Sequence, residues 1–300
     1  MRFSIVIPYR NRASWLSRTL ESIANQTFMD FELLLVDNGS TDVSSALCRD
    51  FAMMHADSPF SVRLLTEPVE GASRARNLGL REAKADYVYF FDSDDEISPM
   101  FLTEADELLK HRPDLQLVCG RTVLCWPDGK REVRKVVESS NARDQILCSM
   151  LTTQGMIIER NFLINIGGWN ENLPKWNDWE LGVRILMRTP KMAWLKGGPY
   201  HHIHQHSESL TGLSWAATYE SLRPSLEAVR QLASESKSLR RALACREAVI
   251  AAELSIEGRN AEADALLVEA QELCSTITWC YAYRRLGGRG TWRLFRFFYR

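Results

Sequence analysis

Four carboxylates follow an apolar run in the first third of the chain. The run Tyr87–Phe91 (YVYFF) ends in a cluster that consists of Asp92, Asp94, Asp95 and Glu96. Like charges this close repel one another, so the cluster needs solvent or a cation to stabilise it. Carboxylate oxygens are the ligands that Mg²⁺ and Mn²⁺ prefer in proteins. The stretch therefore predicts either a solvated acidic loop or a site for a divalent cation.

Two further polar segments follow apolar runs earlier in the chain. The segment PYRNR (8–12) comes after the β-branched run Ser4–Ile7, and DNGSTD (37–42) comes after Phe31–Val36. Short apolar runs that end in polar turns are typical of buried β-strands. Both segments are therefore expected to lie in loops at the ends of strands.

The spacing of apolar residues between these strands indicates helices. Helices are expected over residues 16–23 and 74–84, and further strands over Val62–Thr66 and Tyr87–Phe91. Alternating strands and helices, with near-continuous apolar strands, predict an α/β fold whose mostly parallel sheet is flanked by helices on both faces. Such sheets bind ligands at the carboxyl ends of their strands. We therefore expect the three polar segments to converge on one crevice.

The second half of the chain is less regular. The strands expected there are Leu115–Trp126, Lys130–Glu138, Met156–Glu159 and one within Trp194–His206. From about Ala216 to Ser275 the composition and spacing are helical. Within that stretch, EGRN (257–260) is expected to form the turn of a helical hairpin.

Composition excludes several classes of protein. The formal net charge is -1, so no overall field favours nucleic acid. The seven scattered cysteines contain no CxxC pair, which argues against a disulfide framework or zinc ribbon and fits a reducing compartment. No signal-peptide core is recognised, and no stretch approaches the roughly 20 apolar residues of a membrane span. We expect a cytoplasmic protein that binds no nucleic acid.

Charge is uneven at the C-terminal end of the sequence. Residues 281–300 contain six arginines and seven aromatic residues but no acidic residue. Arginines that alternate with large aromatic side chains suit an amphipathic helix on an anionic bilayer. Peripheral contact with the inner face of the cell membrane is therefore one expectation. The alternative is a terminal helix that packs its aromatic side chains on the protein.

Taken in order, the motifs resemble family 2 glycosyltransferases of the GT-A fold. The segments that carry the resemblance are SIVIPYRNR (4–12), LLLVDNGSTD (33–42), EGASRARNLGLREAKADYVYFFDSDDEISP (70–99), GGWNE (167–171) and NDWEL (177–181). The resemblance runs over roughly residues 3–211. It implies a Rossmann-like GT-A catalytic domain over residues 1–214. Residues 215–300 lie outside it and are expected to form a helical C-terminal extension.

The resemblance also implies an activity and a cofactor. Members of the family are inverting enzymes that transfer a sugar from a nucleotide-diphosphate sugar to a hydroxyl, using Mn²⁺ or Mg²⁺. The metal neutralises charge on the diphosphate leaving group. UDP is the first choice of nucleotide. The acceptor is expected to be a glycan or lipid-linked molecule, in cell-envelope or capsular polysaccharide or lipopolysaccharide synthesis.

The residues that would bind the donor are assigned by position in the motifs. The implied nucleotide-sugar binding residues are Pro8, Tyr9, Arg10, Asn11, Asp37, Asn38, Arg74, Arg76, Asn77, Asp92 and Ser93. Arginines near a helix start suit a pyrophosphate, although in some relatives Arg76 holds the acidic loop instead. Asp94 is the implied metal ligand, and Asp95 supports either role. Glu96 is expected only to begin the exit loop.

Asn38 departs from the family pattern, which often has two successive aspartates here. In relatives this position accepts a hydrogen bond from the imino N–H of uracil, and an asparagine carbonyl can still accept it without charge. The base therefore stays open, with guanine and thymine behind uracil. The alternative for Asp37 and Asn38 is a plain Asx turn.

An inverting transfer needs a base that takes the proton of the acceptor. Asp178 aligns with the family's aspartate base, while Asn177 stands where relatives have a glutamate. Glu180 is two residues further on and cannot share the helix face of Asp178. Trp176 and Trp179 are candidate platforms for the acceptor or sugar, although we expect one of them to lie in the core. The alternative for Asp178 is a helix N-cap.

The histidine-rich segment HHIHQHSESLT (201–211) resembles a His-x-x-Ser-x-Thr element of the family. His206, Ser209 and Thr211 fit that element, which makes His206 the second candidate metal ligand, followed by His204. A neutral imidazole can bind metal or donate to phosphate. A dedicated zinc site is the disfavoured alternative.

Two other functions compete with a glycosyltransferase. A nucleotidyltransferase that makes a nucleotide sugar also uses an α/β fold with an acidic metal site, but commonly has a glycine-rich loop that PYRNR lacks. A catalytically degenerate scaffold subunit is the non-enzymatic alternative. Asn38 and Asn177 favour the scaffold, while Asp92, Asp94 and Asp178 argue against it.

Overall fold

The computed structural model describes residues 1–205 and 214–286, which internal contacts divide into two units. The first unit contains residues 1–136, 151–171 and 190–205, and the second contains residues 137–150, 172–189 and 214–286. Each unit is described by itself. The division of function expected at residue 214 stays a prediction.

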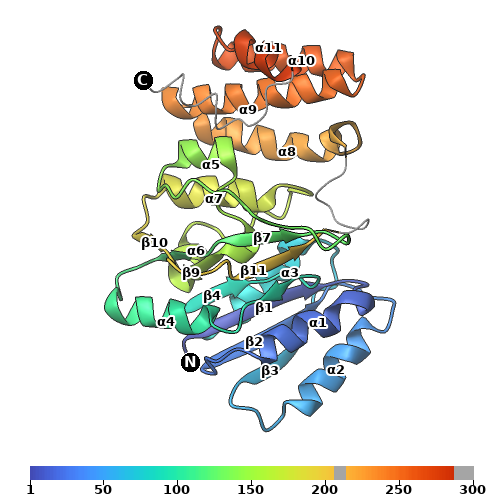
Figure 1. Ribbon diagram of the computed structural model, residues 1–300, viewed down its shortest axis with the longest axis vertical. Helices are drawn as coiled ribbons and strands as arrows, with labels where there is room; N and C mark the ends of the chain where they lie inside the picture. The colour runs from blue at the N-terminus through green and yellow to red at the C-terminus, as the bar shows by residue number, and fades with distance from the viewer. Residues whose placement is uncertain (206–213, 287–300) are drawn as a thin grey trace. The chain divides into compact units, whose positions relative to one another are not determined.

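Within the described residues, a seven-stranded sheet forms the centre of the first unit (Figure 1). Its strands are β1 (Phe3–Tyr9), β2 (Phe31–Asp37), β3 (Ser61–Thr66), β4 (Tyr87–Phe90), β6 (Leu117–Cys119), β9 (Met156–Glu159) and β10 (Met192–Trp194). They lie in the order β10–β6–β9–β4–β1–β2–β3. Strands β1 to β4 are parallel, and β9 runs antiparallel to β4 and β6. The predicted mostly parallel α/β sheet is confirmed.

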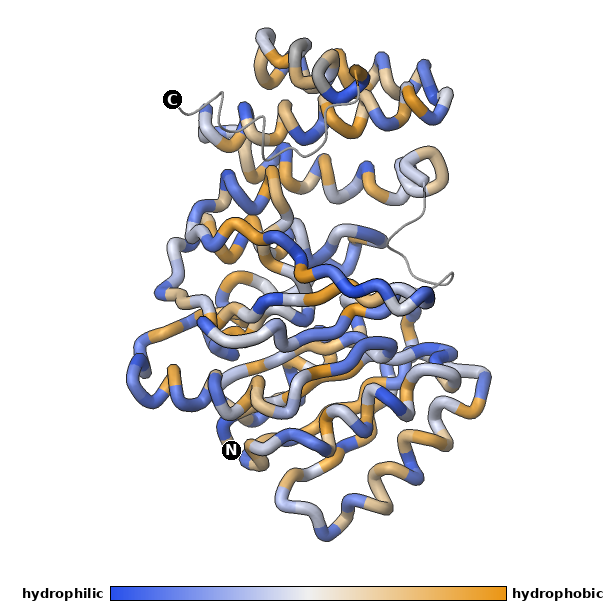
Figure 2. Tube along the Cα trace, viewed as in Figure 1, coloured by the Kyte–Doolittle hydropathy of each residue, from blue (hydrophilic) through white to orange (hydrophobic). Residues whose placement is uncertain are grey.

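Helices cover both faces of this sheet. The helices of the first unit are α1 (Ala13–Ala24), α2 (Ser44–Met54), α3 (Ala72–Glu82), α4 (Phe101–His111) and α6 (Arg160–Asn165). Leu16 and Leu20 of α1 pack in one cluster with Ile5 of β1, while Gly79 of α3 faces Val6. Because neighbouring strand residues point to opposite faces, α1 and α3 lie on opposite sides of β1. Figure 2 shows apolar residues both in the strands and along the helices.

A second, four-stranded sheet is present in residues 96–204 of the first unit. Its strands are β5 (Glu96–Ile97), β7 (Thr122–Cys125), β8 (Arg131–Val133) and β11 (His201–His204), in the order β5–β11–β7–β8. The single strand expected over 115–126 is therefore wrong, whereas the strand expected within Trp194–His206 is present as β11. The stretch 115–126 breaks at Gly120, where an added Cβ would lie 2.9 Å from the Phe101 ring. The halves β6 and β7 join different sheets.

The second unit is helical in its described residues. Its helices are α5 (Ala142–Cys148), α7 (Asn177–Met187), α8 (Trp215–Ala233), α9 (Lys237–Ile256), α10 (Asn260–Leu273) and α11 (Thr278–Arg285). The helical hairpin predicted at EGRN is confirmed, because α9 and α10 pack together across the turn. In residues 1–205 and 214–286, no helix is both long and apolar enough to span a membrane. Of the basic-aromatic tail expected over residues 281–300, only residues 281–286 are among the described residues, and residues 281–285 belong to α11.

Candidate active site

The loops after β1 and β2 are bonded together at one edge of the seven-stranded sheet. The Oδ1 atom of Asn11 accepts the N–H of Thr41 at 2.8 Å and the N–H of Asp42 at 3.3 Å. In return, the Asn11 N–H donates to Ser40 Oγ at 3.2 Å. Asn11 adopts a positive φ of 51°, which asparagine tolerates better than most residues. The segments PYRNR and DNGSTD therefore lie side by side.

β2 ends at Asp37, and the side-chain oxygens of Asp37 and of the next residue, Asn38, all accept hydrogen bonds. Asp37 accepts the Ser40 N–H at 2.9 Å through Oδ1 and the Ser45 hydroxyl through Oδ2. Asn38 is 6% exposed, and its amide bonds to the backbone of residues 67–71. The loop after β3 is thereby joined to the loop after β2. Asp37 thus bonds within its own turn, whereas Asn38 bonds to a distant loop and is not part of a plain Asx turn.

Other residues implied in donor binding differ in exposure. Pro8 and Tyr9 end β1 and are buried, and burial raises the pKa of the Tyr9 hydroxyl. Arg10 is exposed and forms an ion pair with Glu70 in the loop after β3. Ser93 is buried inside the acidic loop. Their donor contacts stay predictions.

Fixed donors hold two aspartates of the acidic cluster. Asp92 accepts from Arg76 Nη2 at 2.7 Å and from Gln154 Nε2 at 2.7 Å. The same Gln154 amide donates to Oδ2 of Asp95, whose Oδ1 accepts the His204 N–H at 2.9 Å. Arg76 therefore holds the acidic loop, which is the structural role that was considered for it.

Arginines from the β1 loop and α1 face the other two acids. Arg12 Nε lies 3.8 Å from Oδ2 of Asp94, and Arg18 donates to the Asp94 carbonyl at 3.0 Å. Arg18 Nε also lies 3.1 Å from Glu96, and His204 Nε2 is 2.7 Å from the same carboxylate. Glu96 is the first residue of β5 and pairs two side chains, so its assignment to a mere exit loop is wrong. Guanidinium groups are the cations that balance the cluster.

Burial separates the protonation behaviour of the acids. Asp95 is 2% exposed; burial and the negative charges of Asp94 and Asp92 hold its pKa well above the usual range. A buried carboxyl that retains its proton adds no charge to the loop. Asp92, Asp94 and Glu96 are all partly exposed, so exposure alone does not distinguish Asp94, and its role as metal ligand stays a prediction.

The start of α3 is bound to the segment GGWNE. Asn77 accepts the Trp169 N–H at 2.9 Å and donates to the Trp169 carbonyl and to Glu171. Arg74 Nη1 lies 2.9 Å from Glu171, and the Arg76 guanidinium lies 4.5 Å from the centre of the Trp169 ring. Two motifs that are far apart in the sequence thus form one structural element.

Two histidines of β11 have defined partners within the protein. His201 is fully buried among the rings of Tyr89 and Phe101, and burial lowers its pKa to about 3. His204 pairs with Glu96, and burial followed by the charge of Arg18 lowers the pKa of His204. His206, Ser209 and Thr211 lie outside the described residues, so the expected metal-binding role of His206 stays a prediction.

The expected base Asp178 belongs to the second unit, at the start of α7. The N-cap residue of α7 is Trp176, so the N-cap alternative for Asp178 is wrong; Oδ1 of Asp178, inside the first turn, accepts the N–H of Trp179 at 2.8 Å. Acids are favoured at a helix N-terminus, because they interact well with the dipole. Glu180 is buried and makes a bidentate ion pair with Arg184 at 2.6 and 2.8 Å. Of the two acids, only Asp178 is partly exposed.

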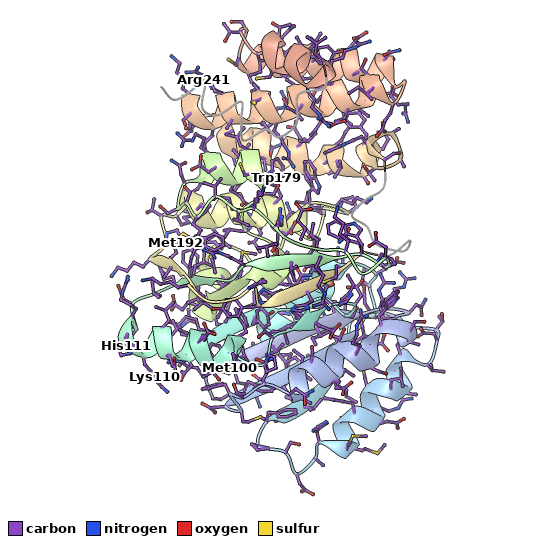
Figure 3. All side chains as sticks on the ribbon, viewed as in Figure 1. Met100, Lys110, His111, Trp179, Met192 and Arg241 are labelled. Carbon is purple, nitrogen blue, oxygen red and sulfur yellow. The ribbon has the colours of Figure 1, made fainter. Side chains whose placement is uncertain are left out.

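The two tryptophans beside Asp178 have different environments. Trp179 is 2% exposed and donates to the carbonyls of Gln145 and Ile146, so it packs in the core between α7 and α5 (Figure 3). Trp176 is partly exposed, lies 5.2 Å from the Trp179 ring, and has the Arg246 guanidinium 4.6 Å above it. The core position expected for one tryptophan is that of Trp179.

Sequence reasoning missed three residues around the acidic loop. Gln154 bridges Asp92 and Asp95 from far along the chain, and Arg12 and Arg18 face the loop from the β1 loop and α1. Nothing in the local sequence around Gln154 marks it. The two arginines could have been found, because α1 follows the strand next to β4 and must lie near its carboxyl end.

Among residues 1–205 and 214–286, no group of three or more His, Cys, Asp or Glu side chains is arranged to hold a metal ion. Asp94 and its neighbouring carboxylates could supply only some of the ligands that a metal ion needs. Divalent cations in phosphate sites commonly take one or two carboxylates and complete their shell with phosphate oxygens and water. The donor set therefore suits a cation that arrives with a diphosphate.

Comparison with known sequences identifies the chain's relatives. A sequence profile of Glycosyl transferase family 2 matches residues 4–164, which is more than half of the chain. The chain belongs to glycosyl transferase family 2. The matched residues include the loops after β1 to β4 and the acidic cluster, so the family's most characteristic segments lie in the first unit.

Relatives and solved structures extend this family assignment. The minor teichoic acid biosynthesis protein GgaB of Bacillus subtilis is 28% identical over 210 residues, which cover 67% of this chain and 23% of GgaB. Among solved structures, TarS of S. aureus, solved with UDP-GlcNAc, matches this chain with a TM-score of 0.63 at 16% identity. The match covers 96% of this chain and 92% of the TarS chain. The mannosyltransferase PcManGT of Pyrobaculum calidifontis, solved with GDP-Man and Mn²⁺, has a TM-score of 0.53 at 16% identity and covers 96% and 88%.

These structural matches establish the GT-A fold for this family 2 chain. The chain spans about a quarter of the length of GgaB.

Proposed function

We propose that this family 2 chain is an inverting glycosyltransferase. It takes a sugar from a nucleotide-diphosphate sugar, with UDP as the first choice, and transfers it to a hydroxyl of a cell-envelope polymer or its lipid-linked precursor. Family membership supports the class of reaction. The teichoic acid protein GgaB supports an envelope acceptor. The UDP-GlcNAc in TarS supports the choice of donor nucleotide.

The observation that carries the proposal is the edge of the sheet where polar loops follow β1, β2 and β4. The first two loops are joined through Asn11, and the third presents the partly exposed Asp94. In a parallel sheet this edge is where ligands bind. The arginines around the acidic loop also supply the positive charge that a diphosphate needs.

Asp94 would hold a divalent cation together with the diphosphate. The Mn²⁺ bound in PcManGT supports the choice of Mn²⁺, and Mg²⁺ remains compatible. When bound, such a cation stabilises the negative charge of the leaving nucleoside diphosphate. Arg12, which lies 3.8 Å from Asp94, is placed to exchange that contact for a phosphate oxygen.

Asp178 would act as the base. Its carboxylate takes the proton of the acceptor hydroxyl while the hydroxyl oxygen forms a bond to the anomeric carbon, and the bond to the diphosphate breaks. Attack on the face opposite to the leaving group inverts the anomeric centre. Partial exposure leaves Asp178 accessible to a hydroxyl, whereas Glu180 is buried in its ion pair.

Binding and turnover of the full chain test the proposal. Isothermal titration with UDP, GDP and dTDP, with and without Mn²⁺, measures nucleotide binding, and a donor-hydrolysis screen of nucleotide sugars identifies the donor. Asp178→Asn is expected to lower turnover by roughly 10²–10⁴-fold while leaving nucleotide affinity unchanged. Asp94→Asn is expected to lose the Mn²⁺-dependent part of binding.

The matched control is Asp264→Asn, which removes an exposed carboxylate from α10. It is expected to change neither turnover nor binding. If no nucleotide binds in the presence of metal, the chain is not a glycosyltransferase and a scaffold role takes its place. If Asp178→Asn retains near-native turnover, another residue is the base.

The membrane role of the C-terminal tail is tested separately. Residues 288–300 can be deleted and the cells fractionated. We expect the truncated protein to leave the membrane fraction if the tail binds the bilayer. An unchanged distribution favours the alternative, in which the aromatic residues pack on the protein.

A further inference from the structure

Asn38 lies in an environment that uses the whole of its side-chain amide. Its Nδ2 donates to the carbonyl of Glu67 at 3.0 Å and to the carbonyl of Val69 at 2.8 Å. Its Oδ1 accepts the N–H of Gly71 at 2.7 Å. The side chain is 6% exposed, so solvent and ligands have little access to it. Three hydrogen bonds therefore tie one residue to the whole loop 67–71.

Only an amide satisfies this arrangement. The two carbonyls require two donors and the Gly71 N–H requires an acceptor, which fixes the orientation of the amide. An aspartate would satisfy Gly71 but would turn a negatively charged oxygen toward the two carbonyls. Buried polar groups that lose their partners in this way are costly. The departure from the family's second aspartate thus has a local structural cause.

The loop that Asn38 holds leads directly into the donor site. Gly71 is the residue before α3 and has a φ of 148°, a conformation that side chains rarely adopt. Arg74 and Arg76 follow in the first turns of α3. Glu70, on the same loop, pairs with Arg10. The position of Gly71 therefore sets where the helix begins and where its arginines stand.

We propose that Asn38 is a positioning residue for the donor diphosphate and not the residue that accepts the imino hydrogen of the base. It holds the loop 67–71 and the start of α3, and through them Arg74, which would face the diphosphate, and Arg76, which holds the acidic loop. The inference rests on the proposed donor site. An aspartate at position 38, which is usual in the family, should therefore weaken donor binding in this chain.

The substitution Asn38→Asp separates the two roles, because they predict opposite results. A base-binding residue would keep or gain affinity for UDP, since a carboxylate is a stronger acceptor than an amide. A positioning residue would lose affinity, by about tenfold from the hydrogen bonds disturbed. We expect the loss, measured by isothermal titration of the full chain with UDP and Mn²⁺.

Two further measurements distinguish positioning from general damage. Titration with inorganic pyrophosphate and Mn²⁺ is expected to weaken by a similar factor, because positioning acts on the diphosphate, whereas base binding would leave pyrophosphate unaffected. The affinity of Asn38→Asp for UDP is also expected to recover as the pH falls toward about 5, because a protonated carboxyl can donate to one carbonyl again. The wild-type chain should show no such recovery.

Hydrogen exchange gives a measurement that does not depend on nucleotide. Protection of the amides of residues 69–72 is expected to fall in Asn38→Asp. Asn25→Asp is the matched control, because Asn25 is exposed at the end of α1 and gains the same charge. It should leave both exchange and affinity unchanged.

The outcomes assign failure to one proposal or the other. If the wild-type chain binds neither UDP nor pyrophosphate, the proposed function fails, while hydrogen exchange still tests the role of Asn38 in the loop. If Asn38→Asp binds UDP within about threefold of the wild type, or more tightly, with unchanged exchange, the positioning role is overturned.

Discussion

Close packing of α3 on the central strand predicts an unusual response to Gly79→Ala. A Cβ on Gly79 would lie 2.2 Å from Cγ1 and 2.9 Å from Cγ2 of Val6, which is fully buried in β1. Valine is branched at Cβ and has few rotamers, so neither methyl group can move aside. The helix must shift away from the sheet, and overpacking of this kind costs about 1–3 kcal/mol. Alanine also favours the helix over glycine by about 1 kcal/mol, which offsets part of the cost.

The sign of the effect should reverse when Val6 is shortened. Val6→Ala removes both clashing methyl groups and is expected to destabilise the chain by itself. In that background Gly79→Ala loses its clash and keeps its helix preference, so it should stabilise the protein by about 1 kcal/mol. The helix preference cancels between the two backgrounds, so the coupling energy of the double-mutant cycle equals the clash cost, about 1–3 kcal/mol.

Hydrogen exchange of β1 amides at increasing urea concentrations measures the stability of the first unit in each variant. Gly167→Ala is the control, because Gly167 has a positive φ of 92° and no atom within 4 Å of an added Cβ. Its cost should be the same with Val6 or Ala at position 6. Equal destabilisation by Gly79→Ala in both backgrounds would show that contact with Val6 does not explain the glycine.

Two further predictions concern buried polar groups. Gln154→Glu replaces the amide that donates to Asp92 and Asp95 with a third acid. The Mn²⁺-dependent affinity for UDP, measured by isothermal titration, should therefore fall about tenfold at neutral pH and recover as the pH is lowered. Unchanged affinity would mean that the Gln154 bridge does not hold the acidic loop. Burial raises the pKa of Glu247 from 4.5 to about 8 although Arg230 Nη2 lies 2.7 Å away. The folded chain therefore binds this proton more tightly than the unfolded chain, and stability should fall as the pH rises from about 4.5 to about 8. Urea denaturation of Glu247→Gln should show a dependence weaker by about 2 kcal/mol between about pH 6 and pH 8, and parallel curves for the two proteins would refute the shifted pKa.

The sequence was sufficient for the parallel strands β1 to β4 of the first unit, but not for its second, four-stranded sheet. Apolar runs closed by polar turns predicted β1, β2 and β4, because strands buried on both faces need continuous apolar residues. The fold rule for parallel sheets then brought PYRNR and DNGSTD together, and the Asn11 bonds confirm that pairing. Strand ends were less predictable: 115–126 was expected as one strand, whereas its halves β6 and β7 pair with strands of different sheets.

The partners of the site residues depended on the tertiary structure. Residue types and their order along the chain indicated the candidate site residues and, by resemblance, the family, which the family profile confirms. Only folding placed Gln154 between Asp92 and Asp95, and only folding placed the loop 67–71 around Asn38. Hydrogen bonds and ion pairs act over a few ångströms between residues far apart in sequence, so no local pattern records them. The motifs therefore indicate the kind of chemistry expected of this chain, while the pairing of its acidic residues with arginines and amides depends on the folded state.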